Sequence, residues 1–247
     1  MTAKRDEILR EMGLGPVWKL RAAPAKVEAA GTLTTTPLLP ADPEPVPEGA
    51  APIAAVVAQA AMSWEELATT VAACRQCRLC EARKQAVLGV GDRNADWLFV
   101  GEGPGAEEDQ RGEPFVGQAG KLLDNMLAAI GLKRGEDVYI ANAVKCRPPE
   151  NRTPAPEEAA ACRPYLERQI ELIQPKLIVA LGRPAAQTLL QAEVKIGAAR
   201  GKLHDYRGIP LIVTYHPAYL LRTLLDKAKA WEDLCFMKRT MTARKDG

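Results

Sequence analysis

The feature that most constrains the fold is an alternation of short apolar runs with amphipathic segments. The apolar runs are rich in β-branched residues and cover residues 97–100, 138–144, 176–182 and 210–215. The helical patterns cover residues 118–131, 156–173, 183–191 and about 223–241. Strands that alternate with helices form parallel sheets covered on both faces. The sequence therefore predicts an α/β protein whose site lies at the carboxyl ends of the strands.

The predicted globular domain covers residues 63–247. It begins with "SWEE", a capping box in which Ser63 is the N-cap and Glu66 follows three residues later. Residues 22–61 are half Ala and Pro, which predicts a disordered linker over residues 22–62. Residues 1–21 form a short N-terminal segment, and residues 5–21 have the pattern of one short amphipathic helix. This helix is either a frayed terminus or a peptide that docks on a protein partner.

Bulk composition excludes some classes of protein. The net charge of +2 gives no general attraction to nucleic acid, so a nucleic-acid site must depend on a local patch. No stretch is long and apolar enough to span a membrane, and the N-terminus lacks the apolar centre of a signal peptide. We therefore expect a cytoplasmic protein with no membrane contact, in which cysteines are metal ligands or free thiols rather than disulfides.

The first apolar run ends in an unusual glycine loop, "LFVGEGPGAEED" at residues 98–109. It lacks the third glycine of a dinucleotide fingerprint and the Gly-Lys-Ser/Thr ending of a phosphate loop. Its acids would also repel a phosphate. The glycines instead favour close approach to a flat, neutral ligand. Phe115 follows in a second loop, where an aromatic ring either stacks on such a ligand or fills the core at a helix start.

Four of the six cysteines are each followed by arginine: Cys74, Cys77, Cys146 and Cys162. Cys80 and Cys235 are not, and we interpret Cys80 as a spare buried thiol. Four thiolates form a tetrahedral site for zinc or hold an iron–sulfur cluster, and the spacing does not separate the two. The adjacent guanidinium groups are expected to offset the negative charge of the thiolates.

Three motifs in this order, together with the cysteines, resemble the family 4 uracil-DNA glycosylases: "GEGPGAEEDQRGEPFVGQAGKLLDNML", "NAVKCRPPENR" and "HPAYLLR". The resemblance covers about residues 64–240. It implies a three-layer α/β/α sandwich with a central four-stranded parallel sheet. It also implies a [4Fe-4S] cluster held by Cys74, Cys77, Cys146 and Cys162. The expected activity is hydrolysis of the bond between uracil and deoxyribose, the start of base excision repair, by a monomer acting on single- or double-stranded DNA.

The resemblance also implies roles for residues of the expected pocket. Phe115 stacks on a flipped-out uracil, and the Asn142 amide pairs with its O4 and N3–H edge, unless Asn142 is only a turn cap. His216 donates a hydrogen bond to uracil O2 as negative charge develops. Gly101, Glu102 and Gly103 complete the pocket. His204 is expected at the surface, in a hairpin or loop.

Water activation and DNA contact rest on fewer residues. Gly103 occupies the position where a sister family has an aspartate, so Glu102 or Glu108 is expected to orient the water; alternatively, Glu108 excludes the 5-methyl group of thymine. Leu220 is the expected wedge in the DNA stack, with Leu221 second, although Leu220 also fits the core of the following helix. Arg222 is expected to hold a phosphate.

Two rival interpretations remain open. A related subfamily that cross-links to DNA uses a histidine after the asparagine motif, and "KCRPPENRTPAP" contains no histidine. We therefore expect turnover without covalent trapping. A non-catalytic iron–sulfur module for DNA binding or electron transfer is the alternative from another class. It would require His216 and Asn142 to be dispensable.

Overall fold

The computed structural model describes residues 62–245. The predictions for residues 1–21 and for the linker up to residue 61 lie outside the described residues. The predicted start of the globular domain is well defined. Ser63 Oγ accepts the backbone N–H of Glu66 at 3.2 Å, and the Glu66 carboxylate accepts the backbone N–H of Ser63 at 2.7 Å. This is the predicted capping box, and it begins helix α3 (Trp64–Ala73).

A mixed six-stranded sheet lies at the centre, in the order β1-β3-β2-β4-β6-β5. Its strands are β1 (Val90–Gly91), β2 (Trp97–Gly101), β3 (Val138–Asn142), β4 (Leu177–Leu181), β5 (Leu203–Tyr206) and β6 (Ile209–Thr214). The four predicted strands β3, β2, β4 and β6 pair in parallel, whereas β1 and β5 add antiparallel edges. The α/β class is confirmed, but the expected sheet of four parallel strands is a sheet of six.

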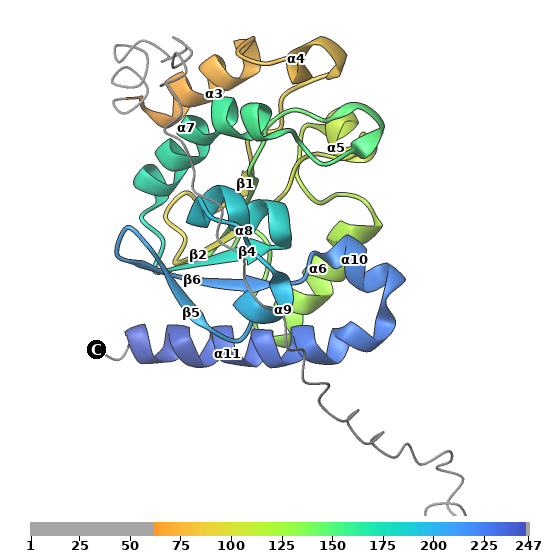
Figure 1. Cartoon of the computed structure of the whole chain (residues 1–247). Coiled ribbons are helices and arrows are strands. Elements are labelled where there is room, and N and C mark those ends of the chain that lie inside the picture. The colour runs from red at the N-terminus through yellow and green to blue at the C-terminus, as the bar shows by residue number, and fades with distance from the viewer. Residues whose placement is uncertain (1–61, 246–247) are drawn as a thin grey trace, which may run out of the picture. The chain divides into compact units, whose positions relative to one another are not determined.

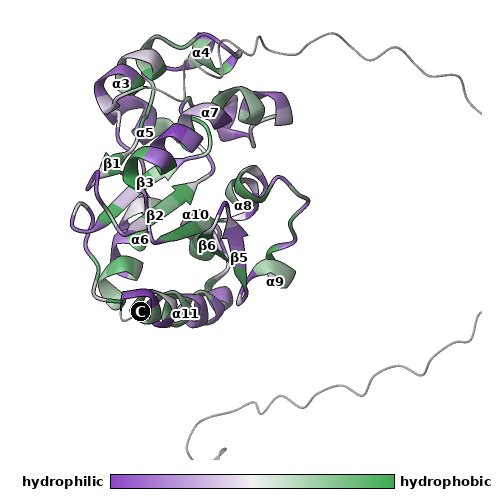
Figure 2. Cartoon of the chain, turned by 90° about the vertical axis from the view of Figure 1, so that its left-hand side faces the viewer, coloured by the Kyte–Doolittle hydropathy of each residue, from purple (hydrophilic) through white to green (hydrophobic). Residues whose placement is uncertain are grey.

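The two unpredicted strands lack the apolar signal because they lie at the sheet edges. Both contain exposed or half-exposed residues, whereas β2, β3 and β4 are buried throughout. Figure 2 shows β5 as hydrophilic beside the hydrophobic β6. The hairpin expected around His204 is present, since β5 and β6 pair antiparallel.

Helices cover both faces of the sheet (Figure 1). Besides α3 they are α4 (Leu79–Ala82), α5 (Ala106–Arg111), α6 (Gln118–Ala129), α7 (Pro156–Ile173), α8 (Arg183–Leu190), α9 (Ile196–Ala199), α10 (Pro217–Arg222) and α11 (Lys227–Lys245), with 3-10 turns η1 (Pro149–Asn151) and η2 (Leu224–Asp226). The helix predicted over residues 223–241 is thus α11, which starts and ends four residues later and is separated from α10 by η2. Residues of α7 and α8 pack on one face, and residues of α6 and α11 pack on the other.

Strand β2 illustrates how these layers are built. Its side chains alternate between the two faces with a period of two residues. Leu98 and Val100 pack with α7 and α8, whereas Trp97 and Phe99 pack with α6 and α11. All four are buried, so the strand has a continuous apolar run instead of an alternating pattern. Each such side chain contributes about 1.5–3 kcal/mol by burial.

The strand register brings the loops after the parallel strands to one edge of the sheet. Gly101 at the end of β2 pairs with Asn142 at the end of β3. Leu181 at the end of β4 pairs with Thr214 at the end of β6. The loops that follow the four parallel strands therefore leave the sheet side by side, where the sequence predicts the site.

Candidate functional site

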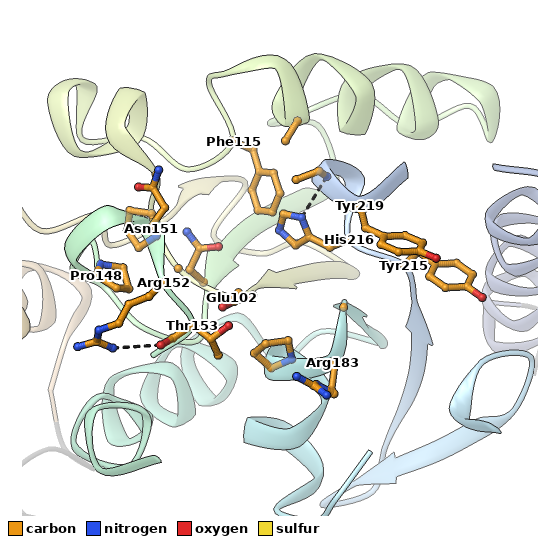
Figure 3. A pocket seen from close by; sticks show the side chains of 18 of the residues that line it. Glu102, Phe115, Pro148, Asn151, Arg152, Thr153, Arg183, Tyr215, His216 and Tyr219 are labelled. Atoms are coloured by element: carbon orange, nitrogen blue, oxygen red, sulfur yellow. Dashed lines mark hydrogen bonds between the residues drawn. The ribbon is translucent and has the colours of Figure 1, made fainter. Parts of the chain in front are cut away.

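A cavity of about 870 Å³ opens at this edge of the sheet (Figure 3). Loops after β2, β3, β4 and β6 contribute to its lining. The predicted site residues that line it are Glu102, Gly103, Glu108, Phe115, Asn142, His216 and Arg222. Gly101 lies directly beneath two of them, Phe115 and Asn142. The structure thus brings together almost all of the residues predicted for the pocket.

The aromatic wall of the cavity consists of Phe115 and His216. Their rings stack with centroids 5.4 Å apart and an interplanar angle of 29°. Figure 3 shows them side by side. Phe115 adopts a φ of 55°, a left-handed conformation that is strained for a bulky residue. Arg134 holds this turn in place by donating to the carbonyls of Pro114 at 2.9 Å and Phe115 at 2.8 Å.

The position of Phe115 is compatible with both of the alternatives that the sequence left open. Its side chain is buried and belongs to the core cluster that contains Phe99 and Leu123. The same ring lines the cavity beside His216. Phe115 therefore fills the core on one side and presents a surface for stacking on the other.

The contacts of His216 define which of its ring nitrogens carries the proton. Nδ1 accepts the backbone N–H of Ala218 at 3.1 Å and caps α10. A nitrogen that accepts a hydrogen bond carries no proton, so the neutral ring carries it on Nε2. Burial lowers the pKa of His216 to about 4, and the nearby Arg222 acts in the same direction. His216 is therefore a neutral hydrogen-bond donor at pH 7.

Asn142 presents a buried amide to the same cavity. Its exposed fraction is 2%, and its Oδ1 has no hydrogen-bond partner among the described residues. A turn cap would require Oδ1 to accept a backbone N–H, which it does not do here. An unpaired polar atom in a cavity wall is costly unless a ligand satisfies it. The contacts thus favour ligand recognition over the turn-cap interpretation of Asn142.

The glycines of the first loop are required by close contacts. A Cβ atom at Gly101 would overlap Oδ1 of Asn142 and would lie 2.6 Å from Cζ of Phe115. A Cβ atom at Gly103 would lie 2.7 Å from Cγ2 of Val144. Both distances are shorter than real Cβ contacts allow. The first glycine thus admits two pocket side chains, and the second leaves space that Val144 occupies.

The two glutamates of the predicted site have different surroundings. Glu102 lines the cavity, and burial raises its pKa, partly offset by the Thr153 hydroxyl and the Arg183 charge. Figure 3 shows these two neighbours on the side of the cavity away from Phe115. A carboxylate with a raised pKa and access to the cavity is suited to accept a proton.

Glu108 is engaged in backbone contacts instead. Its carboxylate accepts the N–H groups of Gly105 at 3.1 Å, Val116 at 3.0 Å and Gly117 at 3.2 Å. Both oxygens are used, and they tie the glycine loop to the loop that carries Phe115. These contacts give Glu108 a role in positioning the two loops, while its water-orienting role, and the alternative that it excludes the 5-methyl group of thymine, stay predictions.

The structure also corrects the predicted wedge. Leu220 is 1% exposed and packs in the core with residues of α6 and α11. Helix α10 begins at Pro217, so Leu220 falls on its inner face and Leu221 on its outer face. Leu221 is 41% exposed, next to Arg222 on the cavity rim. The second candidate from the sequence is the one that is available for contact.

The four arginine-flanked cysteines gather in a separate place, beside α3 and α7. Cys146 and Cys162 belong to one buried cluster together with Tyr165, and the half-buried Cys74 and Cys77 pack against it. Tyr165 donates its hydroxyl to Cys74 Sγ at 3.4 Å, and the Lys145 backbone N–H donates to Cys162 Sγ at 3.2 Å. Within residues 62–245, no three Cys, His, Asp or Glu side chains are grouped as ligands of a single metal ion.

The positive charge near these sulfurs comes from a different arginine than predicted. Arg83 donates to Cys146 Sγ at 2.7 Å. Arg147 donates instead to Asn151 at 2.8 Å, and Arg163 lies 3.4 Å from Glu167. Neither donates a hydrogen bond to a sulfur. Burial raises the pKa of the Cys146 thiol and raises that of Cys162 to about 12.

Sequence reasoning missed several residues that support the two sites. They are Arg83 beside Cys146, Arg134 behind Phe115, Thr153 and Arg183 near Glu102, and the buried Lys145. None stands in a motif that indicates its contact, since each reaches its partner only through the fold. Among the described residues, no helix combines the length and hydropathy needed to cross a membrane.

Comparisons with known proteins agree with this geometry. The family model described as the uracil DNA glycosylase superfamily matches residues 88–235. A type-4 uracil-DNA glycosylase of Archaeoglobus fulgidus is 48% identical over 167 residues, which cover 64% of this chain and 83% of the relative. One from Thermotoga maritima is 49% identical over 160 residues, with the same coverage of 64% and 83%. A type-5 uracil-DNA glycosylase of Thermus thermophilus is 34% identical, covering 52% of this chain and 73% of the relative.

The matched residues 88–235 start before the glycine loop and end beyond the histidine loop, so they include the paired residues Gly101 and Asn142. They also include Cys146 and Cys162, two of the four clustered cysteines. On this match and these relatives, the chain belongs to the uracil DNA glycosylase superfamily.

Proposed function

We propose that this protein excises uracil from DNA by hydrolysing its N-glycosidic bond, the first step of base excision repair. The observation that carries the proposal is the arrangement of His216, Asn142 and Phe115 around one cavity. A flat pyrimidine base can be recognised by a neutral imidazole donor, an amide with unsatisfied hydrogen-bonding groups and an aromatic ring on which it stacks. The relatives named as type-4 uracil-DNA glycosylases support the same activity.

Base recognition rests on the Asn142 amide. Its Oδ1 accepts the N3–H of uracil, and its Nδ2 donates to O4. Cytosine presents an acceptor at N3 and a donor at N4, so it would leave both atoms of the buried amide unpaired. Unpaired groups in such a site discriminate by about 10⁴–10⁵ in favourable cases. The buried, unpartnered state of Oδ1 supports this role.

The reaction breaks the bond between C1′ of deoxyribose and N1 of uracil, and its electron pair leaves with the base. His216 Nε2–H donates to uracil O2, where the negative charge grows, and the neutral imidazole remains neutral. A water oxygen forms the new bond to C1′. The Glu102 carboxylate orients this water and accepts its proton, a role supported by its raised pKa and its place in the cavity.

We further propose that Leu221 enters the DNA stack when uracil leaves it, and that Arg222 binds a neighbouring phosphate. Flipping costs a few kcal/mol, which an inserted apolar side chain partly offsets. Leu221 is exposed and Arg222 lines the cavity, so both can touch DNA while the base is bound.

The four clustered cysteines are proposed to hold a [4Fe-4S] cluster. The chemistry of the donor set supports this proposal, since the four thiols lie in or against one cluster and three of their sulfurs accept hydrogen bonds. When bound, the iron atoms supply the positive charge that keeps buried thiolates deprotonated, and they cross-link the segments that carry the cysteines. Arg83 stabilises the Cys146 thiolate from the solvent side.

The deciding experiment is incubation with a uracil-containing oligonucleotide followed by alkali, with the His216→Ala protein in parallel. We expect strand cleavage at uracil with the native protein and almost none with the variant. Absence of abasic product from the native protein would refute the activity and leave the non-catalytic module. Iron content and a brown visible absorbance test the cluster separately, and zinc in place of iron would refute it.

A further inference from the structure

Lys145 is a buried lysine that neither the base pocket nor the thiol site accounts for. Its exposed fraction is 1%. Nζ donates to the backbone carbonyl of Asn142 at 2.8 Å and to Oε1 of Gln169 at 2.5 Å. A buried ammonium group is costly unless hydrogen bonds compensate for its lost hydration. A methionine or leucine would fill the same space without this cost. The ammonium group differs from them in its hydrogen bonds, which hold the Asn142 carbonyl and the Gln169 side chain.

The partners of Lys145 are themselves fixed. Gln169 is fully buried on α7, and its Nε2 donates to the Leu88 carbonyl at 2.9 Å and to the Tyr139 hydroxyl at 3.3 Å. Gln169 lies seven residues after Cys162, which places both on one face of α7 two turns apart. The ammonium of Lys145 is therefore held against a helix that also carries a thiol of the cysteine site.

The backbone of Lys145 is anchored on the same side. Its N–H donates to Cys162 Sγ at 3.2 Å, and its carbonyl accepts the N–H of Val87 at 2.7 Å. The next residue is Cys146, whose sulfur accepts from Arg83. Only two residues separate Lys145 from Asn142 in the chain, so the segment 142–146 runs directly from the base pocket to the thiol site.

From these contacts we infer that Lys145 is a positioning residue, which acts through the Asn142 carbonyl to hold the Asn142 amide in the register that reads uracil. The inference rests on the proposed function. It connects the two sites physically: α7 and the thiols fix Lys145, and Lys145 fixes the backbone from which the recognition amide projects. Displacements of about 1 Å at such a group can cost about 100-fold in rate.

A double-mutant cycle tests this inference on the iron-loaded protein. The variants are Lys145→Met, Asn142→Ala and the combination, measured by single-turnover cleavage of a uracil oligonucleotide and by inhibition with free uracil. If Lys145 acts through Asn142, Lys145→Met slows cleavage about 10–100-fold and weakens free-uracil inhibition in the native background. In the Asn142→Ala background it has almost no further effect, because the group that it positions is gone.

Iron content, visible absorbance and thermal unfolding of each variant separate positioning from general damage. Lys145→Arg keeps a buried cation with donors and is expected to recover part of the uracil affinity. Lys238→Met on the exposed face of α11 is the matched control and leaves all readouts unchanged. Equal losses from Lys145→Met in both backgrounds, or native rates in Lys145→Met, would overturn the inference.

If Lys145→Met does not fold, Gln169→Met decides the question, because it removes one partner of Nζ and leaves the lysine in place. We expect a smaller loss in the same direction, again absent in the Asn142→Ala background. Undiminished uracil inhibition in folded Gln169→Met would then refute the inference. Absence of cleavage by the native protein would instead refute the proposed activity, so the two failures are distinguishable.

Discussion

The base pocket and the thiol site are held together in different ways. In the pocket, backbone N–H groups hold two of the side chains: the Ala218 N–H holds His216, and three N–H groups hold Glu108. At the thiol site the sulfurs themselves are the acceptors, and one of their donors is the Arg83 side chain. Cys162 lies inside α7 and Cys74 caps the end of α3, whereas Cys77 and Cys146 lie in loops.

This difference indicates which site is complete without a bound group. Protein contacts alone, without a bound group, keep His216 neutral and hold the backbone that carries Asn142. The thiol site contains buried thiols whose pKa values burial raises, so their charged forms are penalised until a cation compensates them. We therefore expect pocket variants to change chemistry at constant stability, and cysteine variants to change stability first.

The largest effect is expected for His216→Ala. Loss of one donor to a developing negative charge costs about 10²–10³ in the rate of cleavage. Single-turnover assays on a single-stranded uracil oligonucleotide measure it, and the thermal midpoint should stay near the native value. His204→Ala is the matched control, since His204 lies on β5 outside the cavity and its Nε2 forms a hydrogen bond with the Ala199 carbonyl. A cleavage rate for His216→Ala within about threefold of the native rate would contradict the role of His216 as a hydrogen-bond donor in the reaction.

The pH dependence of the cleavage rate should report the titration of Glu102 and not that of His216. Because the pKa of His216 is lowered to about 4, its neutral form persists from neutral pH down to about pH 5. The Glu102 carboxylate has a raised pKa, so it protonates at a higher pH than an ordinary glutamate as the pH falls. The rate is therefore lost on the acid side through Glu102.

Glu102→Gln is expected to slow cleavage by about 10² and to remove this acid limb. Single-turnover rates between about pH 4.5 and 8, a range that covers the ordinary pKa of His and comes close to that of Glu, measure both the rate loss and the acid limb. An inflection at about pH 6.5 that persists in Glu102→Gln would contradict the neutral state of His216. An acid limb retained in Glu102→Gln would remove Glu102 as the base.

Cys146→Ser tests the thiol side of the comparison. We expect loss of iron and of visible absorbance, and a lower thermal midpoint that corresponds to several kcal/mol, because metal binding contributes to folding. Cys235→Ser on α11 is the matched control and should keep the full iron content. Full iron content in Cys146→Ser would mean that Cys80 or another thiol completes the site.

The smallest effect is expected at the rim of the pocket. Leu221→Ala should slow cleavage about tenfold on duplex DNA and leave single-stranded DNA unaffected, since only the duplex must be unstacked. Leu220→Ala, in contrast, should lower the free energy of unfolding by about 2–5 kcal/mol, as expected for a buried leucine. If Leu220→Ala showed the duplex-specific loss and Leu221→Ala did not, Leu220 and not Leu221 would be the side chain that enters the DNA stack.

Most of the parallel core was predictable from the sequence because buried strands carry continuous apolar runs. The helix predicted over residues 156–173 begins and ends where α7 does, owing to Pro156 at its start and the turn after Ile173. The edge strands β1 and β5 were not predictable, because half-exposed strands carry no such run. The start of α11 at Lys227 was also not predictable from the sequence, since Thr223 and the leucines that follow it are compatible with an α-helix.

The site was predictable to the level of its residues but not of their contacts. His216, Asn142 and Phe115 stand in loops that follow predicted strands or precede a predicted helix, so their convergence follows from parallel topology. Whether Leu220 or Leu221 faces outward depends on the residue at which α10 begins. Whether Glu108 is free or engaged depends on how close two loops approach.

By itself, the sequence determined the α/β class, the four parallel strands, the loops that meet at their carboxyl ends and the residues that those loops carry. These follow from local periodicity and from the order of elements along the chain. Only the tertiary structure decided which nitrogen of His216 holds a proton, which arginine meets a cysteine, and that Lys145 joins the two sites. Those features depend on distances between residues far apart in the chain, which periodicity does not encode.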